Sequence, residues 1–299
     1  MKLLFGCGYL GSRVAKLWRE SGDEVVIVTR DDAKAVRLRS DGYQALTADV
    51  CEPATLRSLP PAETVLFTVG YDRRSATPHS IGEVYAGGVR NVLEALSAGA
   101  SSSPGMATPL FIYISSTGVY GDAVGDWVDE DTPCRPLREG GKACLAAEEV
   151  LAAHPLGADS VILRLAGIYG PDRIPRADAL RRGEPIDAPA DGYLNLIHVD
   201  DAARTVLAVE RAVAPPRTYC VADGRPPLRR DYYAELARLL GAPPPNFVAP
   251  TPASPAAARA AADKRISNAR LLREIGVEFQ YPSYREGLAS IVRAYRRTS

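Results

Sequence analysis

The chain has 299 residues, and its 36 acidic and 36 basic side chains give a formal net charge of zero. No basic tract stands out, which argues against a nucleic-acid partner, because such a partner requires clustered positive charge to meet its phosphates. Apolar residues make up 46% and charged residues 24%, as expected for a globular protein with one large domain, or with one domain and a smaller lobe.

Cysteines, histidines and hydropathy exclude further classes of protein. The five cysteines are scattered and form no CxxC, and the three histidines lie far apart, so we expect neither a disulfide framework nor a metal site. No apolar run approaches the ~20 residues of a membrane span. The strand-like KLLF at the start leaves no room for a signal peptide. These features predict a cytoplasmic protein without a membrane partner.

Short apolar runs alternate with helical patterns through the first half of the chain. The apolar runs cover residues 2–6, 24–28, 64–70, 110–116 and 160–167, and the helical patterns cover 12–21, 53–58, 81–98 and 140–153. Continuous apolar strands separated by helices are typical of a parallel sheet that is covered on both faces. We therefore predict an α/β protein with a Rossmann-type, doubly wound parallel sheet.

The second half of the chain is less regular. Residues 194–211 indicate a short strand that leads into a helix, and residues 229–241 have helical periodicity that ends on Gly241, a suitable C-cap. Residues 242–265 are Pro-rich and then Ala-rich, so we expect an exposed loop followed by a helix. Two further helical patterns close the chain.

These patterns divide the chain into two parts. Residues 1–167 are predicted to form a dinucleotide-binding Rossmann domain, to which residues 194–222 return. Residues 168–299 are predicted to form mainly a smaller, substrate-binding lobe.

The segment GCGYLG follows the first strand and places Gly6, Gly8 and Gly11 in a GxGxxG pattern, with Tyr9 and Leu10 between them. A helical pattern and a second strand follow it, as in a βαβ unit. Glycines allow the backbone to turn tightly and to approach a diphosphate, while a helix N-terminus offers free amides. We predict that these residues bind the diphosphate of a dinucleotide.

The end of the second strand indicates which dinucleotide is bound. An acidic residue there would bind the 2′-hydroxyl of NAD, whereas an arginine would suit the 2′-phosphate of NADP. Thr29 occupies the expected acidic position and Arg30 follows it, which favours NADP over NAD. Asp31 could still serve as the acid, so NAD remains the alternative.

Further segments follow one another in an order that one family shares. They read LTADVCEP, GGVRNVLEAL, FIYISSTGVYG, LRLAGIYGP and LNLIHVDDAA. Together with GCGYLG, they resemble the extended short-chain dehydrogenase/reductase superfamily and its NAD-dependent epimerase/dehydratase group. The resemblance covers nearly the whole chain, and it implies that Asp49 meets the adenine amino group of the cofactor.

In that family a tyrosine and a lysine four residues later carry the chemistry. The lysine lowers the pKa of the phenol and binds the nicotinamide ribose, and a strand serine orients the substrate oxygen. The resemblance places Ser116 at the serine position, with Thr117 beside it, and Lys142 at the lysine position. The tyrosine position is occupied by Arg138, whose guanidinium does not deprotonate near neutral pH.

Several replacements for the missing tyrosine stay open. Lys142 could itself be the base if burial lowered its pKa. Tyr85, which stands where the family has a structural asparagine, or Tyr120 could supply a phenol. Alternatively, the substrate could require no strong general acid. The candidate catalytic residues are therefore Ser116, Thr117, Lys142 and Tyr85.

The resemblance implies an NAD(P)-dependent epimerase, dehydratase or reductase that acts on a small hydroxyl- or carbonyl-bearing substrate, sugar derivatives included. The short segment 172–193 leaves little chain to bind a second nucleotide, and its arginines indicate an anionic group on the substrate. HVDD at 198–201 is interpreted as a helix N-cap rather than as metal ligands. The alternative function is a non-catalytic NAD(P)-binding redox sensor or scaffold. A monomer or a homodimer is expected.

Overall fold

The computed structural model describes residues 1–72, 78–101, 107–252, 254, 257 and 261–298, and they divide into two compact units. Unit 1 consists of Met1–Ser116, Glu139–Arg164 and Ala203–Tyr219, and unit 2 consists of Thr117–Arg138, Leu165–Ala202 and Cys220–Ser299. Each unit has a hydrophobic core of its own.

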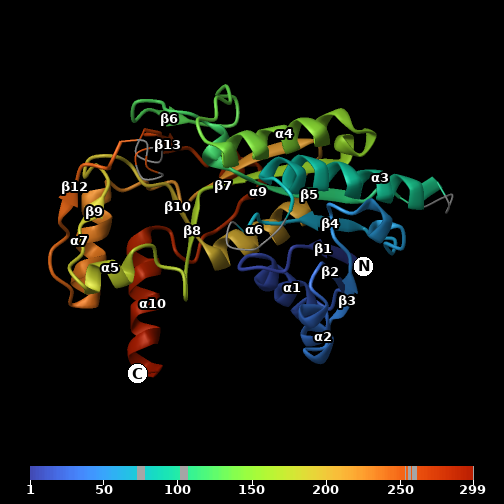
Figure 1. Ribbon diagram of the computed structural model, residues 1–299, viewed down its shortest axis with the longest axis horizontal. Helices are drawn as coiled ribbons and strands as arrows, with labels where there is room; N and C mark the ends of the chain where they lie inside the picture. Colours follow the sequence, from blue (N-terminus) through green and yellow to red (C-terminus); the bar gives the residue numbers. More distant parts are fainter. Residues whose placement is uncertain (73–77, 102–106, 253, 255–256, 258–260, 299) are drawn as a thin grey trace. The chain divides into compact units, whose positions relative to one another are not determined.

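Unit 1 is built on a seven-stranded sheet with the order β11-β7-β5-β4-β1-β2-β3 (Figure 1). Its strands are β1 (Lys2–Phe5), β2 (Val25–Thr29), β3 (Gln44–Thr47), β4 (Thr64–Phe67), β5 (Leu110–Ser116), β7 (Ser160–Leu165) and β11 (Arg217–Val221). The first strand, β1, pairs in parallel with β2 on one side and with β4 on the other. The chain order reverses between β1 and β4, which is where doubly wound sheets bind their ligands. The predicted α/β, doubly wound parallel fold is confirmed.

Helices cover both faces of this sheet. They are α1 (Gly11–Glu20), α2 (Asp32–Ser40), α3 (Gly88–Ser101), α4 (Glu139–Ala153) and α6 (Val199–Ala212), together with 3-10 turns at Pro53–Leu56 and Pro155–Asp159 and a π-helical turn at Glu83–Gly87. Helix α2 and strand β3 are absent from the elements that we expect from the sequence. Their residues are largely polar or exposed, so no apolar periodicity marks them.

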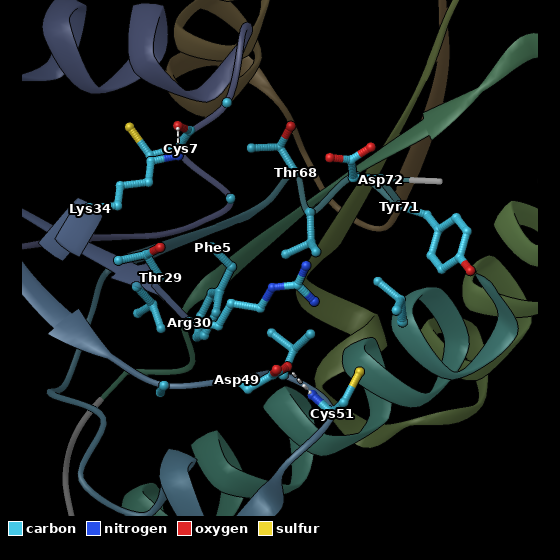
Figure 2. A pocket seen from close by; sticks show the side chains of 18 residues that line it. Phe5, Cys7, Thr29, Arg30, Lys34, Asp49, Cys51, Thr68, Tyr71 and Asp72 are labelled. Carbon is cyan, nitrogen blue, oxygen red and sulfur yellow. Dashed lines mark hydrogen bonds between the residues drawn. The ribbon is translucent and has the colours of Figure 1, made fainter. Parts of the chain in front are cut away.

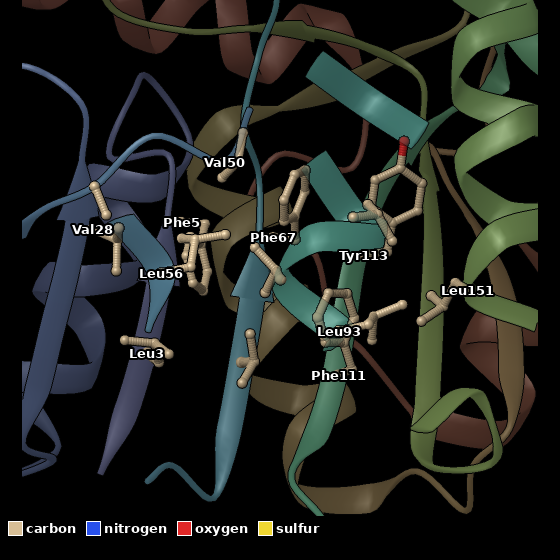
Figure 3. Close-up of a cluster of buried hydrophobic side chains, with 14 of the residues drawn as sticks. Leu3, Phe5, Val28, Val50, Leu56, Phe67, Leu93, Phe111, Tyr113 and Leu151 are labelled. Atoms are coloured by element: carbon tan, nitrogen blue, oxygen red, sulfur yellow. The ribbon is translucent and has the colours of Figure 1, made fainter. Parts of the chain in front are cut away.

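Aromatic rings join neighbouring strands on one face of the sheet. Phe5 stacks on Phe67 with ring centroids 6.1 Å apart, and Phe67 stacks on Phe111 at 6.4 Å (Figure 3). Leu93 of α3 and Leu151 of α4 close over them, and all of these side chains are fully buried. This packing explains why the strands appear in the sequence as continuous apolar runs.

On the other face of the sheet, a small polar network connects helices and strands. The indole Nε1 of Trp18 on α1 donates to Glu210 on α6 at 2.8 Å, and Lys2 lies 2.8 Å from the same carboxylate. Thr64 on β4 donates to it as well, at 2.5 Å. Glu210 therefore links two helices of this face to the strands β1 and β4.

A second network is buried beneath α4. The hydroxyl of Ser115 on β5 donates to Glu148 at 2.5 Å, and the Arg164 guanidinium on β7 donates to both oxygens of the same carboxylate, the shortest of these bonds being 2.6 Å. All three side chains are buried. Because burial strengthens electrostatic interactions and also raises the cost of an unpaired charge, this triad fixes α4 on the sheet.

Unit 2 is assembled from short strand pairs and helices. Its elements are β6 (Trp127–Val128), β8 (Gly167–Tyr169), β9 (Ile186–Asp187), β10 (Leu196–His198), β12 (Phe247–Val248), β13 (Arg265–Ile266), α5 (Ala177–Arg181), α7 (Arg229–Leu240), α9 (Ala269–Ile275) and α10 (Tyr284–Thr298), with a 3-10 turn at Thr117–Val119. Gly241 ends α7 in the left-handed conformation, with φ of 65°, as expected. The helix expected after the Pro-rich loop falls largely on residues 253, 255–256 and 258–260, outside the described residues.

The core of unit 2 is centred on aromatic residues. Tyr169 is fully buried. A Cβ atom at position 287 would lie 2.1 Å from the Tyr169 hydroxyl oxygen, so α10 requires the glycine that it has there, Gly287. Tyr232 on α7 packs against Tyr284 with centroids 5.5 Å apart. Among the described residues, none of the helices combines the length and the apolar character that a membrane span requires.

Removing one member of the triad formed by Ser115, Glu148 and Arg164 should make the folded chain less stable. We expect Arg164→Met to lower the free energy of unfolding by about 3–5 kcal/mol, because it leaves a carboxylate buried without its counter-charge. Replacing both partners, in Glu148→Leu/Arg164→Met, should recover much of this loss. Chemical denaturation of the single and double variants measures both effects. Arg238→Met, which removes an exposed ion pair with Glu235, is the control and should leave stability nearly unchanged. A double variant as unstable as Arg164→Met would contradict the buried-charge explanation.

Candidate functional site

The glycine loop after β1 is shaped by two close backbone approaches. Gly6 has φ of 92°, and a Cβ there would lie 2.6 Å from the Thr68 carbonyl oxygen. A Cβ at Gly11 would lie 2.3 Å from the Gly6 carbonyl oxygen. No side chain fits at either position, so the protein itself requires both glycines.

Gly8 differs from its two neighbours in the motif. A Cβ at Gly8 would meet nothing within 4 Å, so packing within the protein does not require a glycine there. The Ser12 amide donates to the Gly8 carbonyl at 3.0 Å and is an early amide of the α1 ladder. In an α-helix, the amides of the first turn have no acceptor within the helix. Open space and helix-end amides together form a place where a diphosphate fits.

A pocket of about 290 Å³ opens beside this loop, at the carboxyl ends of β1, β2 and β4 (Figure 2). All of its walls belong to unit 1. It is lined by Phe5, Gly6, Cys7, Gly8, Val28, Thr29, Arg30, Lys34, Ala48, Asp49, Val50, Cys51, Thr68, Val69, Gly70, Tyr71, Asp72 and Val84. The pocket thus lies at the switch point of the sheet, as the doubly wound fold predicts.

Two cations line the pocket beyond the second strand. Arg30 follows β2, and Figure 2 shows its side chain extending into the middle of the pocket. Lys34, on α2, donates from Nζ to the Cys7 carbonyl at 2.6 Å. Asp31 instead caps α2, because its carboxylate accepts the Lys34 amide at 2.9 Å. The local charge of this wall is therefore positive.

Asp49, an acidic residue of the pocket lining, is held in place by its neighbours. Asp49 accepts the Cys51 amide at 2.9 Å, and its own amide donates to Thr55 at 3.0 Å. Burial and the Asp49 charge raise the pKa of the Cys51 thiol to about 11, and burial raises the pKa of the Cys7 thiol. Both thiols are therefore protonated near neutral pH and poorly suited to nucleophilic chemistry.

The structure brings together part of the predicted cofactor set. Gly6, Gly8, Thr29, Arg30 and Asp49 all line the pocket. The other predicted residues, Tyr9, Leu10, Gly11 and Lys142, do not belong to its lining.

Two of these residues have clear roles inside the protein. Leu10 is buried in the core, and Tyr9 lies under the Arg13 guanidinium at 4.3 Å.

Sequence reasoning missed Lys34 and the segment 68–72 as parts of the pocket. Lys34 lies on the helix that the periodicity did not reveal. The segment follows β4 directly, so the rule that ligands bind at the carboxyl ends of parallel strands could have found it.

Comparison with known proteins agrees with this geometry. Residues 3–222 match the model of the NAD-dependent epimerase/dehydratase family. The chain belongs to this family. Within the family it is similar to the protein YeeZ of Escherichia coli K12, with 30% identity over 93% of this chain and 95% of YeeZ.

Solved structures extend the comparison. A conserved protein of unknown function from Silicibacter pomeroyi is 28% identical, with a TM-score of 0.77 over 98% of both chains. UDP-glucose 4-epimerase from Thermotoga maritima, solved with UDP-glucose, has a TM-score of 0.79 over 100% of this chain and 99% of its own. Its identity is 20%, so this likeness concerns the fold alone.

The predicted catalytic residues lie at the end of β5, in the turn that follows it and at the start of α4. Ser116 is half-buried and ends β5, and Thr117 is buried and opens the following 3-10 turn. Arg138, which the resemblance places at the tyrosine position, is exposed and directly precedes α4.

Lys142 is exposed on α4, whereas Gly141, Cys144 and Glu148 are buried on that helix. Residues three or four apart lie on one face of a helix, so the face packed on the sheet carries Gly141, Cys144 and Glu148. The burial that would make Lys142 a base is thus absent, and its role in catalysis or ribose binding stays a prediction.

The two candidate phenols have partners of their own. The Tyr85 hydroxyl accepts the Tyr71 amide at 3.2 Å and so holds one wall of the pocket. Tyr120 is buried, and its hydroxyl lies 3.2 Å from the Cys220 sulfur. Tyr85 therefore supports the pocket as part of a π-helical turn, a feature often found at functional sites.

The segment HVDD, residues 198–201, leads from β10 into the first turn of helix α6, as expected. The Asp200 amide donates to Nδ1 of His198 at 3.3 Å, and the Asp201 carboxylate accepts the amides of Gln280 and Tyr281 at 2.9 and 2.8 Å. Both side chains serve the backbone of unit 2. Over the described part of the chain, no group of histidine, cysteine and acidic side chains is arranged to hold a metal ion.

The arginine-rich segment of unit 2 is partly paired within itself. Arg181 bonds Asp178 at 2.8 Å, and Arg182 bonds Glu184 at 2.6 Å. These pairs reduce the positive charge that the segment could offer to an anionic substrate, so its predicted role in anion binding has little support from the geometry.

Asp223 is a buried acid in unit 2. One carboxylate oxygen accepts the Arg225 amide at 2.9 Å, and the other is buried without a hydrogen-bond partner among the described residues. Burial raises the pKa of this carboxyl to about 7, although the Arg225 amide and guanidinium oppose the shift. The group is therefore partly protonated near neutral pH.

The two kinds of glycine in the loop can be separated by substitution. Gly8→Ala should leave the unfolding free energy unchanged and weaken the binding of a nicotinamide dinucleotide, NADH or NADPH, at least ~10-fold, because its methyl group occupies open space beside the helix end. Gly11→Ala should destabilise the fold by about 1–3 kcal/mol or more, because its methyl group meets the Gly6 carbonyl. Chemical denaturation and cofactor titration of both variants test this. Equal losses of stability in the two variants would contradict the conclusion that Gly11 is required by packing within the protein and Gly8 is not.

The Asp223 carboxyl should make stability depend on pH. Its folded pKa lies above its unfolded value, so it stabilises the fold below about pH 4, and this contribution is lost as the pH rises through about 7. Asp223→Asn should remove a slope on the order of 1 kcal/mol per pH unit within this window. Urea denaturation at a series of pH values measures the slope. Identical pH dependence in wild type and variant would show that Asp223 does not titrate in the folded chain.

Proposed function

We propose that this chain binds NADP in the pocket of unit 1 and catalyses hydride transfer with a small hydroxyl- or carbonyl-bearing substrate. The observation that carries the proposal is the pairing of the glycine loop with two cations, Arg30 and Lys34, in one pocket. NAD is the cofactor that the family name specifies, so the preference for NADP rests on these two side chains.

The pocket fits the parts of a dinucleotide. The α1 N-terminus and the space over Gly8 suit the diphosphate, and Arg30 with Lys34 suits a 2′-phosphate. Lys34 would exchange its bond to the Cys7 carbonyl for one to a phosphate oxygen. Asp49, anchored by the Cys51 amide, has a second oxygen available for an adenine amino group.

The proposed reaction uses hydroxyl groups of this chain to orient the substrate. A nicotinamide dinucleotide supplies or accepts a hydride when it is bound. Ser116 and Thr117 would hold the substrate oxygen by hydrogen bonds, and Lys142 would contact the nicotinamide ribose. Tyr85 would keep the pocket wall at Tyr71 in place.

The substrate is proposed to be small, sugar derivatives included. Solved neighbours of the same fold hold UDP-glucose or UDP-glucuronic acid. Here, the segment 172–193 contributes only α5, one short strand and their loops, which offers little surface for a second nucleotide.

A second candidate function follows from Arg138. A guanidinium at the position of the catalytic tyrosine favours a chain that binds NAD(P) without turnover, as a redox sensor or a scaffold. Under both functions, a cytoplasmic location and a monomeric or homodimeric state stay predictions from the sequence.

Cofactor preference tests the binding half of the proposal. NADPH should bind at least ~10-fold more tightly than NADH, and Arg30→Gln should remove most of this difference by weakening NADPH alone, because it removes a charge-assisted bond to phosphate. Fluorescence titration with both cofactors measures the dissociation constants. Arg37→Gln, an exposed change on the same helix as Lys34, is the matched control and should change neither constant. Equal affinities for NADPH and NADH in the wild-type chain would overturn the NADP assignment.

A measurement of turnover distinguishes the proposed enzyme from the proposed sensor or scaffold. Stopped-flow oxidation of bound NADPH with aldehydes, ketones and sugar derivatives should give a measurable rate with at least one of them if the chain is an enzyme. Binding without oxidation across the panel would favour the sensor or scaffold.

A further inference from the structure

Lys34 connects helix α2 to the glycine loop across the pocket of unit 1. Its Nζ donates to the Cys7 carbonyl oxygen at 2.6 Å (Figure 2). The base of the side chain is fixed, because Asp31 caps α2 through the Lys34 amide. Over the described part of the chain, the Lys34 side chain forms no ion pair and no second hydrogen bond. An ammonium group has three N–H donors, so two of them are available to a ligand.

The carbonyl that Lys34 contacts belongs to a peptide unit that is held at both ends. The Cys7 carbonyl and the Gly8 amide are parts of the same planar unit. The Gly8 amide donates to the Gly6 carbonyl at 2.8 Å, while Lys34 donates to the carbonyl oxygen at the other end. The orientation of this peptide unit therefore depends on the Lys34 bond.

The Cys7–Gly8 peptide unit can turn when that bond is lost. Its rotation changes mainly ψ of Cys7 and φ of Gly8, and a glycine adopts many values of φ without a steric cost. A Cβ at Gly8 would meet nothing within 4 Å, whereas Gly6 and Gly11 are fixed by close backbone contacts. The Cys7–Gly8 unit is thus the adjustable part of an otherwise tightly packed loop.

A phosphate group competes with the Cys7 carbonyl for the Lys34 ammonium. A phosphate monoester carries more than one negative charge near neutral pH, whereas a carbonyl is neutral. The attraction between opposite charges therefore adds to the hydrogen bond with a phosphate and favours the exchange of partners. Arg30 and Lys34 both line the pocket, so a phosphate that enters beside them comes within reach of this ammonium.

We propose that Lys34 couples the 2′-phosphate of NADP to the diphosphate loop. The 2′-phosphate draws the ammonium away from the Cys7 carbonyl and releases the Cys7–Gly8 peptide unit, whereas NAD leaves the bond in place. The inference rests on the proposed function, because it requires NADP in the pocket. Lys34 is then a positioning residue of the loop as well as a ligand of the phosphate. Every residue in this coupling belongs to unit 1.

The coupling has a consequence for how the chain distinguishes the two cofactors. Coupling between two subsites is reciprocal, so a loop conformation that favours the release of Lys34 also strengthens the binding of the 2′-phosphate. NADP and NAD therefore leave the glycine loop in two different states. An enzyme and a sensor could both use this difference, because it reports on the cofactor by the backbone as well as by affinity.

The sequence provides a probe for this one peptide unit. Cys7 is the only cysteine of the chain that a glycine follows. A protein labelled with ¹³C at the cysteine carbonyl and with ¹⁵N in glycine therefore gives a single carbonyl–amide correlation in its NMR spectrum, from Cys7 and Gly8. The variant Lys34→Met lacks the donor, so its spectrum gives the position of this signal without the bond.

Adenosine 2′-phosphate tests the coupling, because it carries the 2′-phosphate but no diphosphate. In the wild-type chain it should move the Cys7–Gly8 signal toward the Lys34→Met position, and adenosine should leave the signal in place. NADPH and NADH should give two different positions. In Lys34→Met, adenosine 2′-phosphate should no longer move the signal, and its dissociation constant should rise at least ~10-fold, because a charge-assisted bond is lost. The dissociation constant of NADH should change less than about twofold.

Two further variants serve as controls. Lys16→Met removes an exposed lysine of α1 and should keep the wild-type signal and the wild-type dissociation constants. Lys34→Arg keeps both a positive charge and N–H donors, so it should retain part of the affinity for adenosine 2′-phosphate that Lys34→Met loses.

The outcomes distinguish this inference from the proposed function. Failure of NADPH to bind the wild-type chain refutes the proposed function. If NADPH binds but adenosine 2′-phosphate does not move the Cys7–Gly8 signal, only the coupling is refuted. A signal that moves equally in Lys34→Met also refutes the coupling, because the phosphate then acts on the loop without Lys34. Should Lys34→Met fail to fold, identical signals with NADPH and NADH in the wild-type chain would overturn the inference.

Discussion

The approach of the Gly6 carbonyl to Gly11 is the constraint on which the site depends. It leaves room for no side chain at Gly11, and a similar contact with Thr68 excludes one at Gly6. These contacts turn the chain sharply from the end of β1 into α1 and bring that helix end against the strand ends. The pocket, its two cations and the position of Asp49 all follow from this turn, because they surround the space that it leaves open.

Much of the fold could be predicted from the sequence because each central strand is buried on both faces. Runs such as those of β4 and β5 are apolar without interruption, and their spacing defines a parallel sheet. Helix α2 and strand β3 escape this reasoning, because one lies at the sheet edge and the other is a largely polar helix. Lys34 was missed as a pocket residue for the same reason.

The candidate catalytic residues stay a prediction from the family resemblance. Short motifs predict roles for Ser116, Thr117 and Arg138, whereas the buried Lys264 belongs to a segment whose sequence carries no signature. Its proximity to Tyr120 and Gly121 arises from the pairing of β13 with β6 and from the Asp263 contacts. Such long-range pairing depends on tertiary structure, which no short motif encodes. Conversely, the lysine that a short motif does identify, Lys142, is exposed on α4.

The π-helical turn before α3 has an evolutionary consequence. In this turn the Gly88 amide donates to the Glu83 carbonyl, five residues back instead of four, so the coil holds one residue more than an ordinary helix. Deleting a single residue here would restore regular winding and rotate Tyr85 away from the amide that it anchors. The pocket wall at Tyr71 is therefore sensitive to insertions and deletions in this turn, and a lineage could reshape the site by gaining or losing one codon without changing any side chain that lines it.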